Sequence, residues 1–594
     1  MRLNIRRFLY LVSCWILFSG FTLSSSLLTP SLQSTETYRV NAPYFEGDVR
    51  FSETAVFWFG RVTPTENAVD VRVGYNDDYL FVHVAVIDRR AWYDTSPTPE
   101  TLTQWDSTTV YIDTGSARDA VPTETSHRFD AQLVWWEDRA DYQAAYVGDG
   151  VGWTLTNVLF KTFSDWSSME STPNDDDKND RGWFIQYWIP FESLGLDGCP
   201  TEGTEWALSV VMHDRDSADV LSQTDQSWPA TASADQPATW GKLTFGMPTY
   251  EPPPAIPEAT VTLREELNGV VVPDAPVGGG TLCGGNADYW TEWGDLNYGD
   301  AIVANVQNQG NIDDWPCFSR YYLTFPLDTL PSDREVISAT LTLHHRGNTG
   351  IGWDPGPQPS LVQVLVVNEE WNEATLTWNN APEPIENIAA TWVEPVEEDP
   401  GLPGIPYDWD VSRAVADAYE AGTPVHLAVY EADEKMQSGK YFRTSEEDDF
   451  NAVGRPTLQV TYGIPAPSVT MQASASIGYQ NDVIDYTLSF LGTGNTLTMT
   501  NTLPSGVSDP MAVTIDGSNV DPTYDAGLLT WQGTPALDEQ ITIQYAVTIT
   551  TEARKPLLNQ AKLGSGMGLT SEASVMVLAN PYLLNLPIVL NYRP

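Results

Sequence analysis

Long stretches of this chain alternate apolar and other residues with a period of two. The clearest run is Trp183, Ile185, Tyr187 and Ile189, and residues 206–212 repeat the pattern. Successive side chains of a β-strand point to opposite faces, so each run would place one face on a core and leave the other face polar. Convincing helical spacing is found mainly over residues 411–421. The sequence therefore predicts an all-β fold of tandem antiparallel β-sandwiches.

Clusters of proline divide the 594 residues into three predicted bodies. Proline-rich segments form extended, semi-rigid spacers between domains. We expect these bodies at 38–248, 258–463 and 466–579. A Pro-rich linker at 249–257 and an apolar C-terminal tail at 580–594 complete the division.

The N-terminus has the pattern of a secretory signal peptide, which we assign to residues 1–26. Arg2, Arg6 and Arg7 precede an apolar run over 8–23, and serines follow it. The run is shorter than the roughly 20 residues that a membrane span needs. We therefore expect a secreted, extracellular or cell-surface protein with no transmembrane segment in the mature chain.

The charge balance is strongly acidic, with 80 Asp and Glu against 30 Lys and Arg and a net charge of −50. Phosphate backbones and anionic lipid head groups are held by Lys and Arg. The sequence thus excludes nucleic acid and membrane surfaces as partners.

An exported chain folds in an oxidising compartment, which permits disulfide bonds. Cys283 and Cys317 fall in one predicted body and are the expected pair, which leaves Cys199 unpaired. Three isolated thiols are the alternative.

The order of short motifs in residues 38–248 resembles the family 9 carbohydrate-binding module and its relatives. The motifs lie at residues 75–80, 105–107, 182–195, 203–206, 213–216 and 240–243. This resemblance implies a β-sandwich that binds glycans without cleaving them.

Two tryptophans on predicted loops of this body fit the needs of a sugar site. A pyranose ring stacks its C–H face on a flat aromatic ring, and its hydroxyl groups need carboxylate and amide partners. Trp105 lies beside Gln104 and Asp106, and Trp228 lies near Gln226. These five residues are the predicted carbohydrate-binding set. The alternative is that the rings cap the ends of the core.

Asp214 and Asp216 are the candidate metal ligands. Calcium takes six to eight oxygen ligands, and an exported acidic domain can supply them. A structural calcium ion is therefore possible, and no other cofactor is required.

Motifs in the second and third bodies resemble other exported modules. Residues 320–325, 370–382 and 455–462 are similar to the disaggregatase-related repeat domain, which is also grouped as a jelly-roll carbohydrate-binding module. Strand patterns at 485–490, 527–532 and 541–547 resemble the immunoglobulin-like repeats of bacterial surface proteins, which imply a spacing role.

No short catalytic motif, such as a metalloprotease His pair, a nucleophile elbow or a phosphate-binding loop, occurs in the chain. We therefore predict a non-catalytic protein that recognises polysaccharide. A glycoside hydrolase or polysaccharide lyase is one alternative, because a pair of carboxylates leaves no short motif. A structural or adhesive cell-envelope protein is the other.

Overall fold

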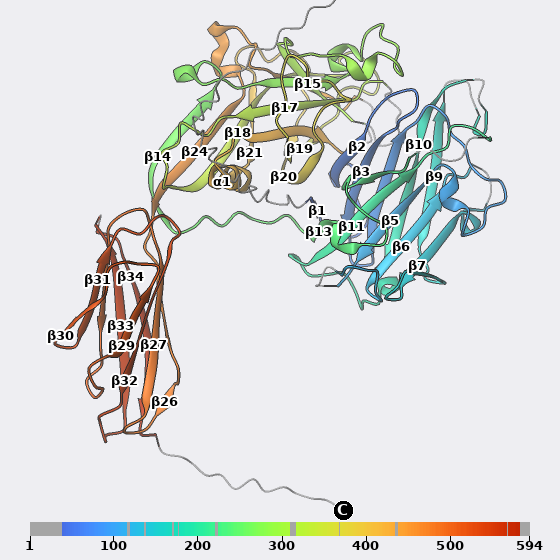
Figure 1. Ribbon diagram of the computed structural model, residues 1–594. Coiled ribbons are helices and arrows are strands. Elements are labelled where there is room, and N and C mark those ends of the chain that lie inside the picture. The colour runs from blue at the N-terminus through green and yellow to red at the C-terminus, as the bar shows by residue number, and fades with distance from the viewer. Residues whose placement is uncertain are drawn as a thin grey trace, which may run out of the picture. The chain divides into compact units, whose positions relative to one another are not determined.

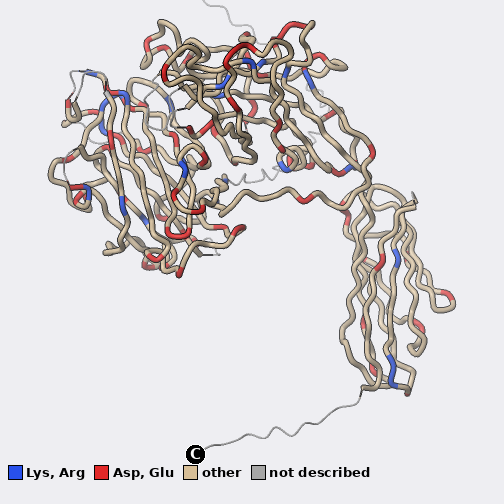
Figure 2. The backbone as a smooth tube through the Cα atoms, turned by 180° about the vertical axis from the view of Figure 1, so that it is seen from behind, with Lys and Arg blue, Asp and Glu red and all other residues tan. Residues whose placement is uncertain are grey.

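The structure is a computed structural model that describes most of the chain from residue 38 onward. The described residues are 38–115, 119–135, 138–168, 172–175, 178–219, 224–308, 316–367, 369–433, 437–566 and 568–581. The predicted signal peptide and most of the predicted C-terminal tail lie outside them. Figure 1 shows an architecture built almost entirely of strands, so the all-β prediction is confirmed. Acidic residues outnumber basic ones along the chain (Figure 2).

The first sandwich, residues 38–248, pairs a five-stranded sheet with a larger one. The five-stranded sheet contains, in spatial order, β2 (Ala55–Gly60), β3 (Ala68–Tyr75), β4 (Tyr79–Ile87), β10 (Asp180–Pro190) and β9 (Lys161–Ser168). The facing strands are β1 (Arg39–Ala42), β13 (Gly241–Phe245), β11 (Glu205–His213), β5 (Ser107–Asp113), β6 (Ser126–Gln132), β7 (Gln143–Gly148) and β8 (Trp153–Thr156), with β12 (Gln226–Trp228) against β11.

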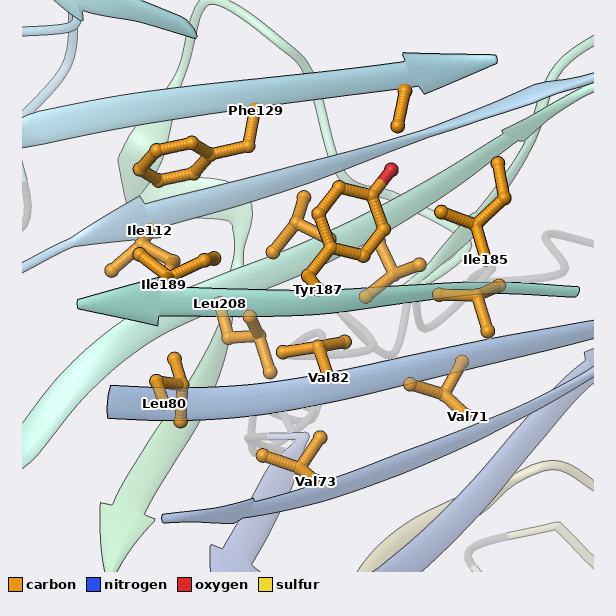
Figure 3. Close-up of a cluster of buried hydrophobic side chains, with 14 of the residues drawn as sticks. Val71, Val73, Leu80, Val82, Ile112, Phe129, Ile185, Tyr187, Ile189 and Leu208 are labelled. Atoms are coloured by element: carbon orange, nitrogen blue, oxygen red, sulfur yellow. The ribbon is translucent and has the colours of Figure 1, made fainter. Parts of the chain in front are cut away.

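The core of this sandwich is formed by the alternate residues that the sequence pattern singles out. Val71, Val82, Ile185 and Tyr187 from the five-stranded sheet meet Leu208 and its neighbours from the facing sheet (Figure 3). The Tyr187 hydroxyl lies 2.6 Å from Thr108 Oγ1, so its polar end is satisfied within the core. The burial of these apolar side chains is the main stabilising contribution to the two-layer packing.

The second sandwich, whose strands span residues 255–465, has the same two-layer plan. One layer contains β15 (Asp274–Gly278), β17 (Ser319–Phe325), β22 (Val425–Glu431), β19 (Ser360–Val367) and β20 (Pro384–Val393). The other contains β14 (Ala255–Arg264), β24 (Thr457–Pro465), β18 (Glu335–Asn348), β23 (Lys440–Arg443) and β16 (Val303–Val306), with β21 (Ile405–Asp410) against β18. Strand β1 pairs with β20, so one sheet runs through both sandwiches.

Three local features of the second sandwich bear on the sequence predictions. Helix α1 (Ser412–Ala421) coincides with the segment of helical spacing and buries Val415. Strand β14 begins at Ala255, so the last residues of the predicted linker pair with β24. Cys283 and Cys317 form a disulfide bond, the pairing that the sequence suggested, and Cys199 is free.

The third body, residues 466–579, consists of two further sheets. One contains β25 (Val469–Ala473), β27 (Val483–Leu491), β32 (Gln540–Thr548) and β29 (Met511–Asp516). The other contains β26 (Ile477–Gly478), β34 (Thr570–Ala579), β33 (Lys555–Ser565), β28 (Leu497–Thr502), β31 (Leu528–Gly533) and β30 (Thr523–Asp525). Tyr486 and Trp531 are buried in its core. Across the described residues, no helix is long and apolar enough to cross a membrane.

Candidate functional site

Trp228, one of the two predicted stacking rings, lies in the core of the first sandwich. Strand β12 pairs with β11 and turns this side chain inward, where its ring centroid is 4.2 Å from that of Phe57. The side chain is 0% exposed. A sugar cannot reach a ring that is packed in this way, which removes Trp228 from the set of binding residues. The alternative reading of this ring, as part of the core, is correct.

Trp105 is only half-buried, and one face of its ring is covered by Arg215. The guanidinium carbon of Arg215 lies 3.8 Å from the ring centroid. The same guanidinium donates a hydrogen bond of 3.3 Å to the backbone carbonyl of Gln104, whose side chain is exposed. Gln226 is half-buried in β12. The structure therefore keeps Gln104 and Trp105 at the surface, with Trp105 engaged in a cation–π contact.

Asp106, predicted to bind sugar, is buried in a cluster of carboxylates. One oxygen atom from each of Asp88, Asp106 and Asp214 lies within 4.8 Å of the other two, and all three residues are buried. The amide of Trp92 donates to Asp106 at 2.6 Å, and Asn67 donates to Asp214 at 3.0 Å. Asp106 thus belongs to the interior of the domain, so its prediction as a rim residue for sugar hydroxyls is corrected.

The electrostatics of this cluster favour a bound cation. Burial is the largest cause of the raised pKa of all three carboxyl groups, and repulsion from neighbouring acids adds to it. The pKa of Asp214 is raised to about 7. Carboxylate oxygens are the ligands that calcium prefers, and buried carboxylates need a counter-ion or a proton. The donor set therefore fits calcium.

The predicted metal ligands are thus placed differently by the structure. Asp214 is a member of the buried cluster, together with Asp88 and Asp106. Asp216 is half-buried and lies outside this trio, although its charge contributes to the raised pKa of Asp214. The other two carboxylates of the cluster come from the residue just after β4 and the residue just before β5, positions that sequence spacing could not connect with Asp214.

The outer face of the five-stranded sheet is aromatic where the sequence pattern predicted a polar surface. The residues of β10 that point away from the core include Phe184, Gln186 and Trp188. In register with them, Phe81 of β4 pairs with Trp188, and Phe163 of β9 pairs with Gln186. We call the outward side chains Phe81, Phe163, Phe184, Gln186 and Trp188 the aromatic face.

Apart from Phe81, which is buried, the rings of the aromatic face are exposed enough to meet a ligand. Trp188, Phe184 and Gln186 are half-buried, and Phe163 is 37% exposed. The Trp188 ring rests on Phe81 edge to face, with centroids 5.6 Å apart. A groove of about 590 Å³ opens over this end of the face. It is lined by Gln186, Trp188, Phe81 and Tyr79, by the segment Asp48–Glu53 and by Trp392 of β20.

Polar groups border the rings of this groove. Arg50 and Glu53 form a two-point ion pair of 2.6 and 2.9 Å at its margin. The Gln186 side chain lies beside Trp188 on the outward face of β10. Flat apolar rings with a few amide and charged groups around them form the kind of surface on which a sugar ring can stack. The signal for this face was present in β10, whose outward positions carry two large rings.

Comparison with known proteins links the second sandwich to carbohydrate recognition. Residues 286–462 match the family model of carbohydrate-binding module family 96. No curated protein matches the chain significantly. This part of the chain is therefore a carbohydrate-binding-module-like domain.

The solved structures that are similar to part of the chain include the following two. One is a family 9 carbohydrate-binding module from Caldicellulosiruptor kristjanssonii in complex with cellotriose, with 15% identity and a TM-score of 0.26, covering 36% of this chain and 95% of that one. The other is a putative carbohydrate-binding protein from Bacteroides uniformis, with 12% identity and a TM-score of 0.26, covering 35% of this chain and 99% of that one.

Proposed function

We propose that this protein is secreted and binds polysaccharide without cleaving it, through the aromatic face of its first sandwich. The observation that carries the proposal is the half-exposed Trp188 ring, which lies in a groove beside Gln186 and rests on Phe81. A ring in this position offers an apolar surface to one pyranose, and the neighbouring amide and carboxylate groups can bind its hydroxyl groups.

The scaffold holds these rings in a fixed arrangement before any ligand arrives. Strand β10 is hydrogen-bonded on both sides, to β4 and to β9. Its inward residues, Ile185 and Tyr187 among them, are fully buried and fix the register of the outward ones. Binding to preformed rings avoids the entropic cost of ordering a loop.

The charges around the groove favour a neutral polysaccharide. Arg50 is neutralised by Glu53, and Asp48 adds a negative charge to the lining. An anionic chain such as a polyuronate would need free cations, and it would be repelled by a protein with a net charge of −50. A chain of neutral hexoses or pentoses carries no such penalty.

Calcium at Asp88, Asp106 and Asp214 would support this function from inside the domain. These residues lie in three separate segments, so one cation would tie the end of β4, the start of β5 and the segment after β11 together. The cation would act on the stability of the sandwich, because all three side chains are buried away from any sugar.

A glycan array tests the proposal directly. The full chain without its predicted signal peptide is compared with Trp188→Ala and with a control, Trp353→Ala, which removes a ring that is 73% exposed elsewhere in the chain. We expect binding to neutral polysaccharides that Trp188→Ala weakens and Trp353→Ala leaves unchanged. Equal binding by both variants would refute the aromatic face as the site. Release of reducing ends or unsaturated sugars from the bound glycans would refute the non-catalytic assignment.

A further inference from the structure

Three acidic side chains of the second sandwich converge from distant parts of the sequence. Asp274 is the first residue of β15, Glu373 lies in the loop between β19 and β20, and Glu446 follows β23. One carboxylate oxygen of each residue lies within 4.8 Å of the others. Asp274 is fully buried, while Glu373 and Glu446 are half-buried.

Hydrogen bonds hold two of these side chains in place. The amide of Asp274 donates a hydrogen bond of 3.0 Å to Glu373 Oε1. Asp274 Oδ2 accepts one of 2.7 Å from the amide of Ser445 and another from the Ser445 hydroxyl. These bonds keep the carboxylates together, although like charges at this distance repel each other.

The protein supplies little positive charge to offset this repulsion. Burial is the largest cause of the raised pKa of Asp274, Glu373 and Glu446, and the charged neighbours that contribute are acids. Two other buried carboxylates, by contrast, each form an ion pair with an arginine. Asp70 pairs with Arg320 at 2.7 Å, and Asp130 pairs with Arg128 at the same distance.

These hydrogen bonds leave two carboxylate oxygens of the cluster unsatisfied. Asp274 Oδ1 and Glu446 Oε2 are both buried, and neither has a hydrogen-bond partner among the described residues. Burial, and then the charges of Asp274, Glu446 and Glu373, raise the pKa of the fully buried Tyr321 beside the cluster. Unsatisfied buried oxygens of this kind are costly unless a ligand occupies the space between them.

We propose that Asp274, Glu373 and Glu446 form a calcium-binding site in the second sandwich. Calcium binds oxygen at about 2.3–2.6 Å with six to eight ligands, so its ligand atoms lie up to about 5 Å apart. The three carboxylates meet this condition, and water can complete the shell on the side of the half-buried glutamates. Magnesium is less suitable, because it requires a near-ideal octahedron and binds shorter.

A cation at this site would hold three separate segments of the sandwich together. It would link β15 to the loop that carries Glu373 and to the segment that follows β23. The site is separate from the carboxylate cluster of the first sandwich, and it does not depend on the proposed sugar-binding face.

Calorimetric titration of the full chain with calcium, after treatment with EDTA and removal of the chelator, tests this site. The variants are Glu446→Gln and Asp274→Asn, with Glu420→Gln as a control that removes an exposed acid from α1 of the same sandwich. We expect Glu446→Gln and Asp274→Asn each to lose one bound calcium per chain or to weaken it at least about tenfold, since a ligand charge is removed. Glu420→Gln should match the unmodified chain, and magnesium should not displace calcium.

Thermal unfolding in EDTA shows whether the variants fold. Neutralising Glu446 relieves repulsion, so the Glu446→Gln chain should melt at the same or a higher temperature than the unmodified chain without calcium, and it should lose the stabilisation that calcium gives through this site. Asp214→Asn, which alters only the first cluster, should leave the second site intact. Unchanged calcium binding by Glu446→Gln, or loss of all calcium binding in Asp214→Asn, would overturn the proposal.

Discussion

The indole of Trp183 donates a hydrogen bond of 2.7 Å to Asp88 Oδ2 within the first sandwich. Trp183 lies on the inward face of β10, and Trp188 lies on the outward face of the same strand. One strand therefore reaches both the carboxylate cluster and the aromatic face. Its register fixes both sites, because a shift by one residue would exchange the two faces.

Replacing Trp188 with alanine should weaken binding to a neutral polysaccharide by about tenfold, or about 1.4 kcal/mol, as expected for the loss of a stacked ring. The melting temperature should change by only a few degrees, since the ring is half-exposed. Affinity electrophoresis with the polysaccharide identified on the array measures this change in affinity. Phe163→Ala provides a second variant on the same face, and a normal affinity in both would show that the sugar binds elsewhere.

Calcium should stabilise the first sandwich through Asp88, Asp106 and Asp214. At a hundredfold excess over Kd, a single bound ion adds about 2.7 kcal/mol to the free energy of unfolding. Asp106→Asn should remove this gain, because it neutralises one carboxylate of the trio. Denaturant titrations with calcium and with EDTA measure the difference, and an equal calcium response in the variant would contradict the assignment.

Trp183→Phe keeps an aromatic ring in the core but removes the donor to Asp88. We expect a loss of about 2 kcal/mol in the free energy of unfolding, because a buried hydrogen bond to a carboxylate is broken. Calcium affinity should also change, since Asp88 loses a partner that orients it. Tyr187→Phe, which removes a hydroxyl that hydrogen-bonds to Thr108, is the matched control and should leave calcium affinity unaltered.

His345 should make stability depend on pH. Burial, followed by the charge of Lys440, lowers its pKa to about 4, whereas an unfolded chain has a value near 6.5. The folded state therefore holds this imidazole neutral, so its contribution is complete above pH 6.5 and is lost as the pH falls toward 4. The full effect is on the order of 3 kcal/mol.

The variant His345→Gln isolates this effect from other titrating groups. The difference in unfolding free energy between the unmodified chain and the variant should shrink as the pH falls from 7 to 4. Urea titrations at fixed ionic strength and in EDTA provide the values. Parallel curves for the two proteins across this interval would show that His345 is not the group responsible.

The Cys283–Cys317 bond closes a separation of 34 residues. Removing it as Cys283→Ser with Cys317→Ser should cost about 3–4 kcal/mol, mainly by freeing the unfolded chain. The difference in unfolding free energy between the double variant and the oxidised chain measures this cost. A melting temperature equal to that of the oxidised chain would contradict it.

Local patterns were sufficient for the strands and for much of the core. The alternation in β10 predicted that Trp183, Ile185 and Tyr187 face inward, and all three are buried. The same alternation predicted a polar outer face, and this prediction is wrong, because Phe184 and Trp188 occupy outward positions. The sequence contains these rings, but it does not show which residues of β4 and β9 lie beside them.

Trp105 and Trp228 show why the predicted site could be placed only in part. Both stand beside polar residues in the sequence, yet Trp228 is fully buried and Trp105 lies against Arg215. Whether a loop tryptophan faces a sugar or the core depends on which strand its own segment pairs with. That pairing is a long-range property, and a short motif does not contain it.

The sequence by itself determined the all-β class, the helical segment at α1 and the acidic character of the chain, because each follows from the order or number of nearby residues. Only the tertiary structure brought Asp88, Asp106 and Asp214 together, and likewise Asp274, Glu373 and Glu446. The physical reason is that a cation site or a binding face is set by distances between side chains. Those distances arise only when strands far apart in the chain are paired and packed.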